Sequence, residues 1–409
     1  SLLELYGLNP EMGHKEVGGV KATIGTTGEL DYVMEQIEID WKYSTNPLEA
    51  ADKELLARIM IKETFRRSGL EVSFQAKPID NVAGNGEHIH IGVSLKTDSG
   101  KEYNLFSPFE KDSYLNVFGY GSLMGILNHY DVLSAFVSPT NDALNRLKPD
   151  FEAPVSSVCS LGVSPEMPSR NRTVLIGLVS DLENEMARRF EFRAANPHTN
   201  LYITLPAILM CMLDGITYAV ESEKSEQELL KEISKQPGEF LGYLNENYAF
   251  RAEKNIFIDY SEEEREKLFG KSPKTVYDVI IALREANGNN DYLKKVFSEM
   301  FIDSYCDYML DRWNKEICNR IVPVMLEELY RTYSFTGTDP KNMKGKKVIE
   351  KLMDYIIRDD SEKKSLRTRI KEASEIDDYE LLSRLYQKFI KACEELKKMS
   401  EAYQNNFVY

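Results

Sequence analysis

Cysteine, histidine and tryptophan are scarce in this chain, with five, five and two residues among 409. The cysteines are scattered, odd in number and form no CxxC pair, which argues against a disulfide framework and against a zinc site. We therefore expect reduced thiols and a cytoplasmic protein, the thiols being those of Cys159, Cys211, Cys306, Cys318 and Cys393.

Positive charge is also in deficit, because 51 basic residues face 66 acidic ones and leave a formal net charge of −15. A nucleic-acid surface needs a basic patch, and none is visible. No signal peptide is present, and no apolar run approaches the roughly 20 residues of a membrane span. We expect neither nucleic acid nor a membrane as a partner.

Two nucleotide motifs are missing as well, the Walker A sequence and the kinase glycine-rich loop. Any nucleotide would be held by a different kind of site. The length is sufficient for two domains, or for one domain with a large appendage. The chain opens on Ser1 without Met and enters structured sequence at once, which indicates that a natural N-terminal part has been removed.

The stretch NVAGNGEHIHIGVSL, residues 81–95, contains two of the five histidines. Gly84 and Gly86 form a flexible entry, and the following alternation predicts a β-strand. His88 and His90 would then share one strand face. Alone, such a pair is more often structural than functional.

The first 221 residues alternate between strand and helix patterns. His14 and Glu16 share one strand face, and Gln36, Glu38 and Asp40 share another. We expect strands at 33–43, 71–76, 87–95, 169–179 and 188–194, helices at 49–67, 109–137 and 201–216, and a long loop at 138–154.

From about residue 222 the pattern is helical, with Ser near several helix starts and acids in the first turns. The composition changes again at the break 336–345, TGTDPKNMKG. We expect three segments: a sheet domain at 1–221, a helical part at 222–335 and a helical hairpin at 346–409.

The sequence RRFEFRA, residues 188–194, places three charged side chains on one strand face and two phenylalanines on the other. The simpler interpretation is an exposed strand with cross-strand salt bridges. The functional one is a charged barrel interior that grips anions while Glu191 holds a metal. An apolar helix follows directly, so the strand is expected to be central, which favours the functional interpretation.

Carboxylates and imidazole on several strands suit Mg²⁺ or Mn²⁺, which prefer oxygen ligands with an occasional nitrogen. Arginines supply forked cations for carboxylate and phosphate oxygens. Metals and arginines together suggest phosphoryl transfer from a nucleotide. The candidate residues are Glu16, Glu38, His88 and Glu191 for metal, and Arg146, Arg172, Arg189 and Arg193 for anions.

Five ordered motifs lie within residues 1–217, namely HKEVGG with EQIEID, KPIDNVAGNGEHIHIGVSL, SPTNDALNRLKPDFEAP, SRNRT and RRFEFRAANPHTNLYITLPAILMCMLDGI. In that order they resemble the metal strands, the two-histidine signature, the flexible loop, the phosphate arginine strand, and the last metal strand and helix of the glutamine synthetase catalytic domain. The helical remainder resembles the long, type III-like members of that family.

The resemblance implies an α+β fold with a curved, mainly antiparallel sheet of the glutamine synthetase/guanido kinase-like type, flanked by helices and followed by a long helical C-terminal region. It implies ATP-dependent ligation of ammonium to glutamate through γ-glutamyl phosphate, two Mg²⁺ or Mn²⁺ sites, and a ring-type homo-oligomer. Glu16 and Glu38 would serve one metal, and His88 and Glu191 the other.

It also assigns the substrate and nucleotide residues. Gly84, Arg146 and Arg193 would seat glutamate, and Glu152 would help to bind and deprotonate ammonium while its loop excludes water. Arg172 and Arg189 would neutralise the ATP phosphates, with His90 near the nucleotide; Glu152 and Arg172 would be the catalytic residues.

Three positions depart from the family pattern: Ala83 stands for an asparagine, Gly177 for a second phosphate arginine and Met186 for a lysine. The family's N-terminal β-grasp domain and first catalytic strand lie outside these residues, so we expect the isolated chain to be impaired or inactive. A ligase for a larger amine, and a non-catalytic scaffold or regulator, therefore remain alternatives.

Overall fold

The computed structural model describes residues 2–24, 30–79, 82–148, 157–181, 183–286, 291–334 and 343–405. Their contacts form two compact units, one of Ser1–Ser272 with Glu285–Glu299 and one of Pro273–Arg284 with Met300–Tyr409. The three segments expected from the sequence remain a prediction.

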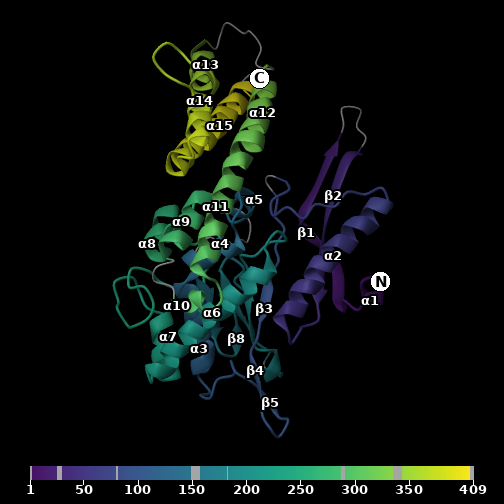
Figure 1. Ribbon diagram of the computed structural model, residues 1–409, viewed down its shortest axis with the longest axis vertical. Helices are drawn as coiled ribbons and strands as arrows, with labels where there is room; N and C mark the ends of the chain where they lie inside the picture. The colour runs from purple at the N-terminus through teal and green to yellow at the C-terminus, as the bar shows by residue number, and fades with distance from the viewer. Residues whose placement is uncertain are drawn as a thin grey trace. The chain divides into compact units, whose positions relative to one another are not determined.

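A long antiparallel hairpin follows the short helix α1 (Leu2–Leu5) and consists of β1 (Pro10–Ile24) and β2 (Leu30–Trp41), as Figure 1 shows. His14 lies opposite Glu38, and Glu16 lies opposite Gln36. Directly opposed residues of an antiparallel pair point to the same face. Four polar side chains therefore share one face, which confirms the alternation expected for both strands.

Helix α2 (Pro47–Arg67) follows the hairpin and confirms the helix expected at 49–67. Asn46 caps its N-terminus by accepting a hydrogen bond from the Leu48 amide at 3.0 Å, and Pro47 stands in the first turn, where a missing amide hydrogen is harmless. Residues 71–76 are irregular and not a strand. Residues 82–88, which contain Gly84 and Gly86, are irregular as well and are called the glycine-rich loop.

The central sheet consists of β3 (Ile89–Ile91), β6 (Cys159–Ser160), β9 (Ile176–Val179) and β10 (Arg189–Phe192). Their order is β3-β10-β9-β6; β3 and β9 pair with β10 in antiparallel orientation, and β6 pairs with β9 in parallel.

The sheet is open at both ends of that order, so these described strands form no closed barrel. The charged face of β10 borders a cleft, and the prediction that it faces a barrel interior is wrong.

The apolar face of β10 anchors the sheet in the core. Phe190 and Phe192 are fully buried, and Phe190 stacks on Phe106 with ring centroids 4.6 Å apart. Because side chains alternate along a strand, burying both rings turns Arg189, Glu191 and Arg193 to the opposite face. The alternation expected for this stretch is confirmed.

Helices α3 (Val117–Asn128) and α6 (Leu201–Glu221) pack with their backbones in close approach. A Cβ atom on Gly125 would lie 1.9 Å from the Cys211 carbonyl oxygen, and one on Gly215 would lie 2.1 Å from that of Gly121. Glycine is required at these positions because no side chain fits.

Helix α6 is long and apolar enough to cross a membrane by length and composition alone, contrary to the expectation that no run approaches that length. Core helices pass the same test. Its packing against α3 supports the core assignment.

Three predicted elements are shorter or divided. The strand expected at 87–95 is β3 followed by β4 (Ser94–Lys96), which pairs with β5 (Glu102–Asn104). The helix expected at 109–137 is α3 and α4 (Tyr130–Val137), and residues 109–116 are not helical. The expected loop at 138–154 contains helix α5 (Asn141–Arg146).

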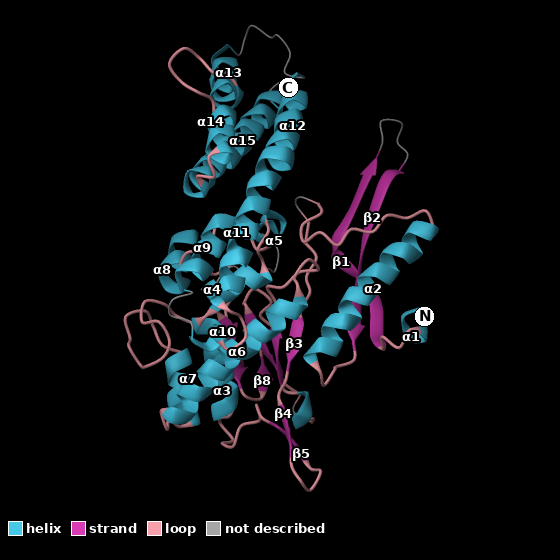
Figure 2. Ribbon diagram, viewed as in Figure 1, coloured by secondary structure: helices cyan, strands magenta, loops and turns pink. Residues whose placement is uncertain are grey.

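The other elements of the first unit are short, and Figure 2 shows how strongly helices predominate. Ser225 and Ser261 form capping boxes with Glu228 and Glu264, as the sequence pattern predicts. The elements are β7 (Gly162–Ser164), β8 (Met167–Pro168), η1 (Glu185–Ala187), α7 (Glu226–Ile233), α8 (Glu262–Phe269) and α10 (Asp291–Lys294).

Every secondary-structure element that the structure describes in the second unit is a helix. Trp313 is buried and meets Tyr386 edge to face, which ties α11 to α15. Three helices follow the break, α13 (Met343–Ile357), α14 (Leu366–Glu375) and α15 (Tyr379–Asn405), one more than a simple hairpin has. The earlier elements of this unit are α9 (Val276–Ala286), α11 (Glu299–Glu316), the π-helical turn η2 (Ile317–Ile321) and α12 (Val322–Ser334).

Candidate functional site

A wide cleft in the first unit, with a volume of about 3350 Å³, runs from the β1–β2 hairpin to the central sheet. Its wall contains residues of β2, of the glycine-rich loop, of β3 and of β10. All ten of the described site residues predicted from the sequence line it, namely Glu16, Glu38, Gly84, His88, His90, Arg146, Arg172, Arg189, Glu191 and Arg193.

 Of these residues, Arg146 reaches the cleft wall from beneath the glycine-rich loop and is itself buried.

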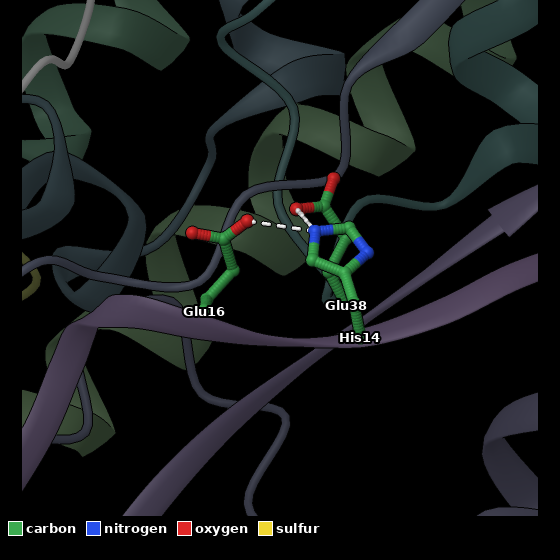
Figure 3. A group of neighbouring side chains, drawn as sticks. All are labelled: His14, Glu16 and Glu38. Atoms are coloured by element: carbon green, nitrogen blue, oxygen red, sulfur yellow. Dashed lines mark hydrogen bonds and ion pairs between the residues drawn. The ribbon is translucent and has the colours of Figure 1, made fainter.

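One side of the cleft carries a compact group of metal-type ligands on the hairpin, drawn in Figure 3. Nε2 of His14 lies 3.0 Å from a Glu16 carboxylate oxygen and 3.6 Å from one of Glu38. One ligand atom from each residue lies within 4.8 Å of the others. The cross-strand pairing of His14 with Glu38 produces this grouping.

Crowding of acids at this group changes the protonation of Glu38. Burial, the hydrogen bond with Glu16 and the negative charge of Asp40 raise the pKa of Glu38 to about 7. Asp40 also lies 3.7 Å from Nδ1 of His14. A divalent cation would relieve this repulsion, because it favours the ionised carboxylates.

The second group lies on the sheet. Nδ1 of His88 is 3.2 Å from a carboxylate oxygen of Glu191, and the Arg193 guanidinium pairs with the same oxygen. Burial opposes ionisation of Glu191, but the hydrogen bond from His88 and the charge of Arg193 outweigh it and lower its pKa to about 2. Burial lowers the pKa of His88, so its imidazole is neutral and able to bind a metal.

The face of β10 continues to a third group of cationic side chains. Nε of Arg189 donates to Nδ1 of His90 at 2.8 Å, and the Arg189 guanidinium also donates to the Ala187 carbonyl. Arg172 is exposed, and its carbonyl accepts a hydrogen bond from Nε of Arg193 at 3.2 Å. This end of the cleft is suited to anions.

The glycine-rich loop lies directly on Arg146. A Cβ atom on Gly84 would be 2.3 Å from the Ala76 carbonyl oxygen and 2.9 Å from Cγ of Arg146, so only glycine fits. The buried Arg146 guanidinium donates to the carbonyls of Arg193 and Ala194, which joins helix α5 to the end of β10.

The positions that depart from the family pattern also lie near the cleft. Ala83 and Met186 line it, and Gly177 pairs directly with Glu191 across β9 and β10. A Cβ atom on Gly177 would meet only a Glu191 oxygen at 3.9 Å. Glu152 lies outside the described residues.

The structure adds residues that the sequence-based metal and substrate assignments omitted. His14 belongs to the hairpin group, and Gln36 reaches from the same face to the glycine-rich loop. Alternation along both strands already placed them on the faces of Glu16 and Glu38. What the alternation could not supply is the pairing of β1 with β2.

The two groups fit divalent metals by their chemistry. Carboxylates with one imidazole suit Mn²⁺ and Mg²⁺ better than they suit thiolate-preferring ions. None of the five cysteines, all of which the structure describes, is among the residues that line the cleft: Cys159, Cys211, Cys306 and Cys393 are buried, and Cys318 lies in the η2 turn. Glu16 and Glu38, with His14, would hold one ion, and His88 with Glu191 another.

Comparison with known proteins identifies the family. Residues 26–240 match the family model for the glutamine synthetase catalytic domain, which is more than half of the chain. The chain belongs to the glutamine synthetase family.

Two relatives illustrate the distance within the glutamine synthetase family. The glutamine synthetase of Sulfolobus acidocaldarius is 29% identical over 308 residues, covering 75% of this chain and 54% of the relative. That of Streptomyces filamentosus is 32% identical over 240 residues, covering 57% and 44%. The chain thus spans about half the length of the curated relatives it matches.

The fold comparison points the same way. The glutamine synthetase of Plasmodium falciparum superposes with a TM-score of 0.52 at 22% identity, covering 77% of this chain and 59% of that one. At this identity the likeness shows the fold, and it confirms the expected α+β glutamine synthetase fold.

Proposed function

We propose that this chain forms the catalytic portion of an ATP-dependent glutamate–ammonia ligase. The proposal depends on one observation: three groups of side chains line the same cleft. They are a carboxylate–imidazole group on the hairpin, a second such group on the sheet, and arginines next to the second group. Phosphoryl transfer to a carboxylate needs these components, because two negatively charged reactants, ATP and the glutamate carboxylate, must be brought together.

In this proposal each group of side chains has a separate task. Arg193 and the backbone around Gly84 seat glutamate, and Arg146 holds both from below through its bonds to the Arg193 and Ala194 carbonyls. Arg172 and Arg189 face the phosphates of ATP, and His90 orients Arg189. Glu152 is proposed to receive a proton from ammonium.

The reaction has two steps. An oxygen of the glutamate γ-carboxylate attacks the γ-phosphorus of ATP, and ADP leaves with the bonding electron pair. Ammonia then attacks the γ-carbonyl carbon of γ-glutamyl phosphate, a proton passes to a base, and phosphate leaves with the original carboxylate oxygen. The arginines stabilise charge at the transferring phosphoryl group, and exclusion of water protects the acyl phosphate.

Divalent ions at the two carboxylate–imidazole groups, Mg²⁺ or Mn²⁺, would neutralise phosphate and carboxylate charge during both steps. We further propose that the protein assembles as a homo-oligomer, as the family resemblance implies. We also propose that it is cytoplasmic, as its scattered cysteines suggest.

The test is a ligation assay on the longest native chain that contains these residues, with ATP, glutamate and Mn²⁺ or Mg²⁺. We expect glutamine with ammonium, and loss of at least about a hundredfold in rate for Glu191→Ala, since the metal ligand and the Arg193 partner disappear together. Lys15→Met, on the opposite face of the hairpin, is the control.

The larger-amine alternative is favoured by one feature, the small side chain of Ala83 on the cleft wall. The same assay with alkylamines and polyamines separates the two. Faster turnover with a polyamine than with ammonium would replace ammonia ligation by amine ligation. Absence of ATP and Mn²⁺ binding in calorimetry would leave a non-catalytic scaffold.

A further inference from the structure

Gln36 lies on the face of β2 that carries Glu38, two residues away along the strand, and directly opposite Glu16. Its side chain leaves the hairpin and reaches the glycine-rich loop. Nε2 of Gln36 donates to the Gly84 carbonyl at 3.2 Å and to Oδ1 of Asn85 at 2.7 Å. These two hydrogen bonds join the hairpin to the loop that leads to His88.

 That position makes Gln36 a bridge between the hairpin and the glycine-rich loop.

The loop beyond this bridge is held by further hydrogen bonds. Asn85 donates through Nδ2 to the Gln75 carbonyl at 2.7 Å and through its amide to the Ala76 carbonyl at 2.8 Å. The Ala76 and Lys77 amides in turn donate to the carboxylate of Asp142. Asp142 belongs to helix α5, which also carries Arg146.

The direction of these bonds fixes the chemistry required at position 36. A carbonyl oxygen can only accept, so the Gly84 carbonyl needs an N–H donor. Oδ1 of Asn85 is also an acceptor, because Nδ2 of the same amide is used on the Gln75 carbonyl. A side chain that places one donor between two acceptors satisfies both, and glutamate or methionine does not.

The backbone geometry explains why such a bridge has consequences for function. The close contacts of Gly84 with Ala76 and Arg146 leave no room for a shift toward either of them. Losing the bridge therefore releases the loop toward the open cleft. His88, three residues after Asn85, would follow that movement.

We propose that Gln36 is a positioning residue that sets the placement of the glycine-rich loop relative to the hairpin, and through it the spacing of the two metal groups and the seat for glutamate. The role in ligation rests on the proposed function. The bridge itself can be tested without it, because the contacts belong to the metal-free chain.

The first test measures amide hydrogen exchange in the metal-free native chain, for wild type, Gln36→Met and Asn85→Ala. Methionine keeps the length of glutamine and removes the donor, and Asn85→Ala breaks the same bond from the loop side. We expect exchange of peptides covering 82–91 to accelerate by about tenfold in both variants, in line with a net loss of one or two hydrogen bonds.

Lys15→Met is the matched control, because it removes an ion pair with Glu35 on the opposite face of the same hairpin at 2.5 Å. It should leave exchange at 82–91 unchanged. Unchanged exchange in Gln36→Met, or equal acceleration in Lys15→Met, would overturn the bridge.

The second test separates positioning from general stability through Mn²⁺ titrations followed by electron paramagnetic resonance, and through kinetics. Gln36→Met should lower the affinity for Mn²⁺ at the His88–Glu191 group by about tenfold. It should raise KM for glutamate by a similar factor while KM for ATP stays constant. The double variant with Asn85→Ala should be no worse than either single one. Additive losses, or equal rises in both KM values, would contradict positioning.

The outcomes also distinguish this inference from the proposed function. Accelerated exchange and weaker Mn²⁺ binding in a protein without ligase activity would support the bridge and reject the ligase. Ligase activity of the wild type, together with unchanged exchange and unchanged KM for glutamate in Gln36→Met, would support the ligase and reject the bridge.

Discussion

Nε of Arg189 donates a hydrogen bond to Nδ1 of His90 across 2.8 Å. An imidazole nitrogen that accepts carries no proton, so the proton of His90 is on Nε2. Burial and the charge of Arg189 lower the pKa of His90, which keeps the ring neutral. The neutral imidazole orients the guanidinium without competing with it for anions.

His90→Ala should therefore impair the arginine without removing its charge. We expect KM for ATP to rise by about tenfold, since a hydrogen bond to a charged group contributes roughly 1.5–3 kcal/mol. His90→Gln, which can still accept through its amide oxygen, should recover most of the loss. Steady-state kinetics with varied ATP measures this, and an equal defect in both variants would disprove the orienting role.

Metal binding at the hairpin should depend on pH near neutrality. The pKa of Glu38 is raised to about 7 by burial and by its acidic neighbours, so protons compete with the cation below that pH. We expect Mn²⁺ affinity to fall by up to about tenfold per pH unit between pH 7 and 6, and to change little above pH 8.

Mn²⁺ titrations at pH 6, 7 and 8 measure this dependence. Glu38→Gln should bind more weakly at every pH and lose most of the slope between pH 6 and 7. A slope that persists in Glu38→Gln would assign the competing proton to another group.

The contact of α3 with α6 should not tolerate a side chain. Gly125→Ala places a Cβ atom 1.9 Å from the Cys211 carbonyl oxygen, and the helices must separate. We expect a loss of roughly 3 kcal/mol or more in the free energy of unfolding, at the upper end of overpacking effects.

The control for this substitution is Gly177→Ala, whose Cβ would meet one oxygen at 3.9 Å. It should change the free energy of unfolding by less than about 1 kcal/mol. Urea titrations of both variants give the comparison. Equal losses would mean that close approach does not determine the glycine at position 125.

A buried acid outside the cleft provides a pH-dependent test of the fold. Glu232 is fully buried, and hydrogen bonds from Lys224, Tyr218 and two backbone amides outweigh burial and lower its pKa below the ordinary 4.5. A lowered pKa in the folded state contributes stability above pH 4.5, which is lost as the pH falls through the folded pKa.

Glu232→Gln should therefore cost about 3 kcal/mol at pH 7, because it leaves the Lys224 ammonium without its counter-charge. The difference from wild type should shrink as the pH falls below 4.5. Glu228→Gln, on the exposed side of the same helix, is the control and should cost well under 1 kcal/mol. A difference that is constant with pH would contradict the assigned ionisation.

Local patterns predicted much of this structure. Alternation placed Phe190 and Phe192 in the core and the charged residues of β10 opposite them, and Ser225 and Ser261 signalled helix starts. These features depend on neighbours within one element. The motif resemblance added the family and its fold, which the comparisons confirm.

The remainder depends on contacts between distant residues. Residues 71–76 have a strand-like composition but are irregular, because their backbone is used by Asn85 and Asp142. The role of Gln36 depends on the glycine-rich loop 48 residues later. Neither relationship leaves a periodic signal in the sequence.

The placement of Arg146 likewise could not be predicted from charge. Its guanidinium is buried under two glycines and donates to backbone carbonyls, which removes it from open solvent. Sequence reasoning identified the residue for substrate binding. The structure shows that it also supports the strand end carrying Arg193.

Oxygen transfer from glutamate to phosphate tests the central proposal most directly. The longest native chain that contains these residues would be incubated with ATP, ammonium, Mn²⁺ and glutamate labelled with ¹⁸O in the γ-carboxylate, and the phosphate analysed by mass spectrometry. We expect one ¹⁸O atom in each phosphate released, together with one glutamine, because the acyl phosphate loses the carboxylate oxygen. Phosphate without ¹⁸O, or phosphate released without glutamate, would show hydrolysis by water and contradict the proposed ligation.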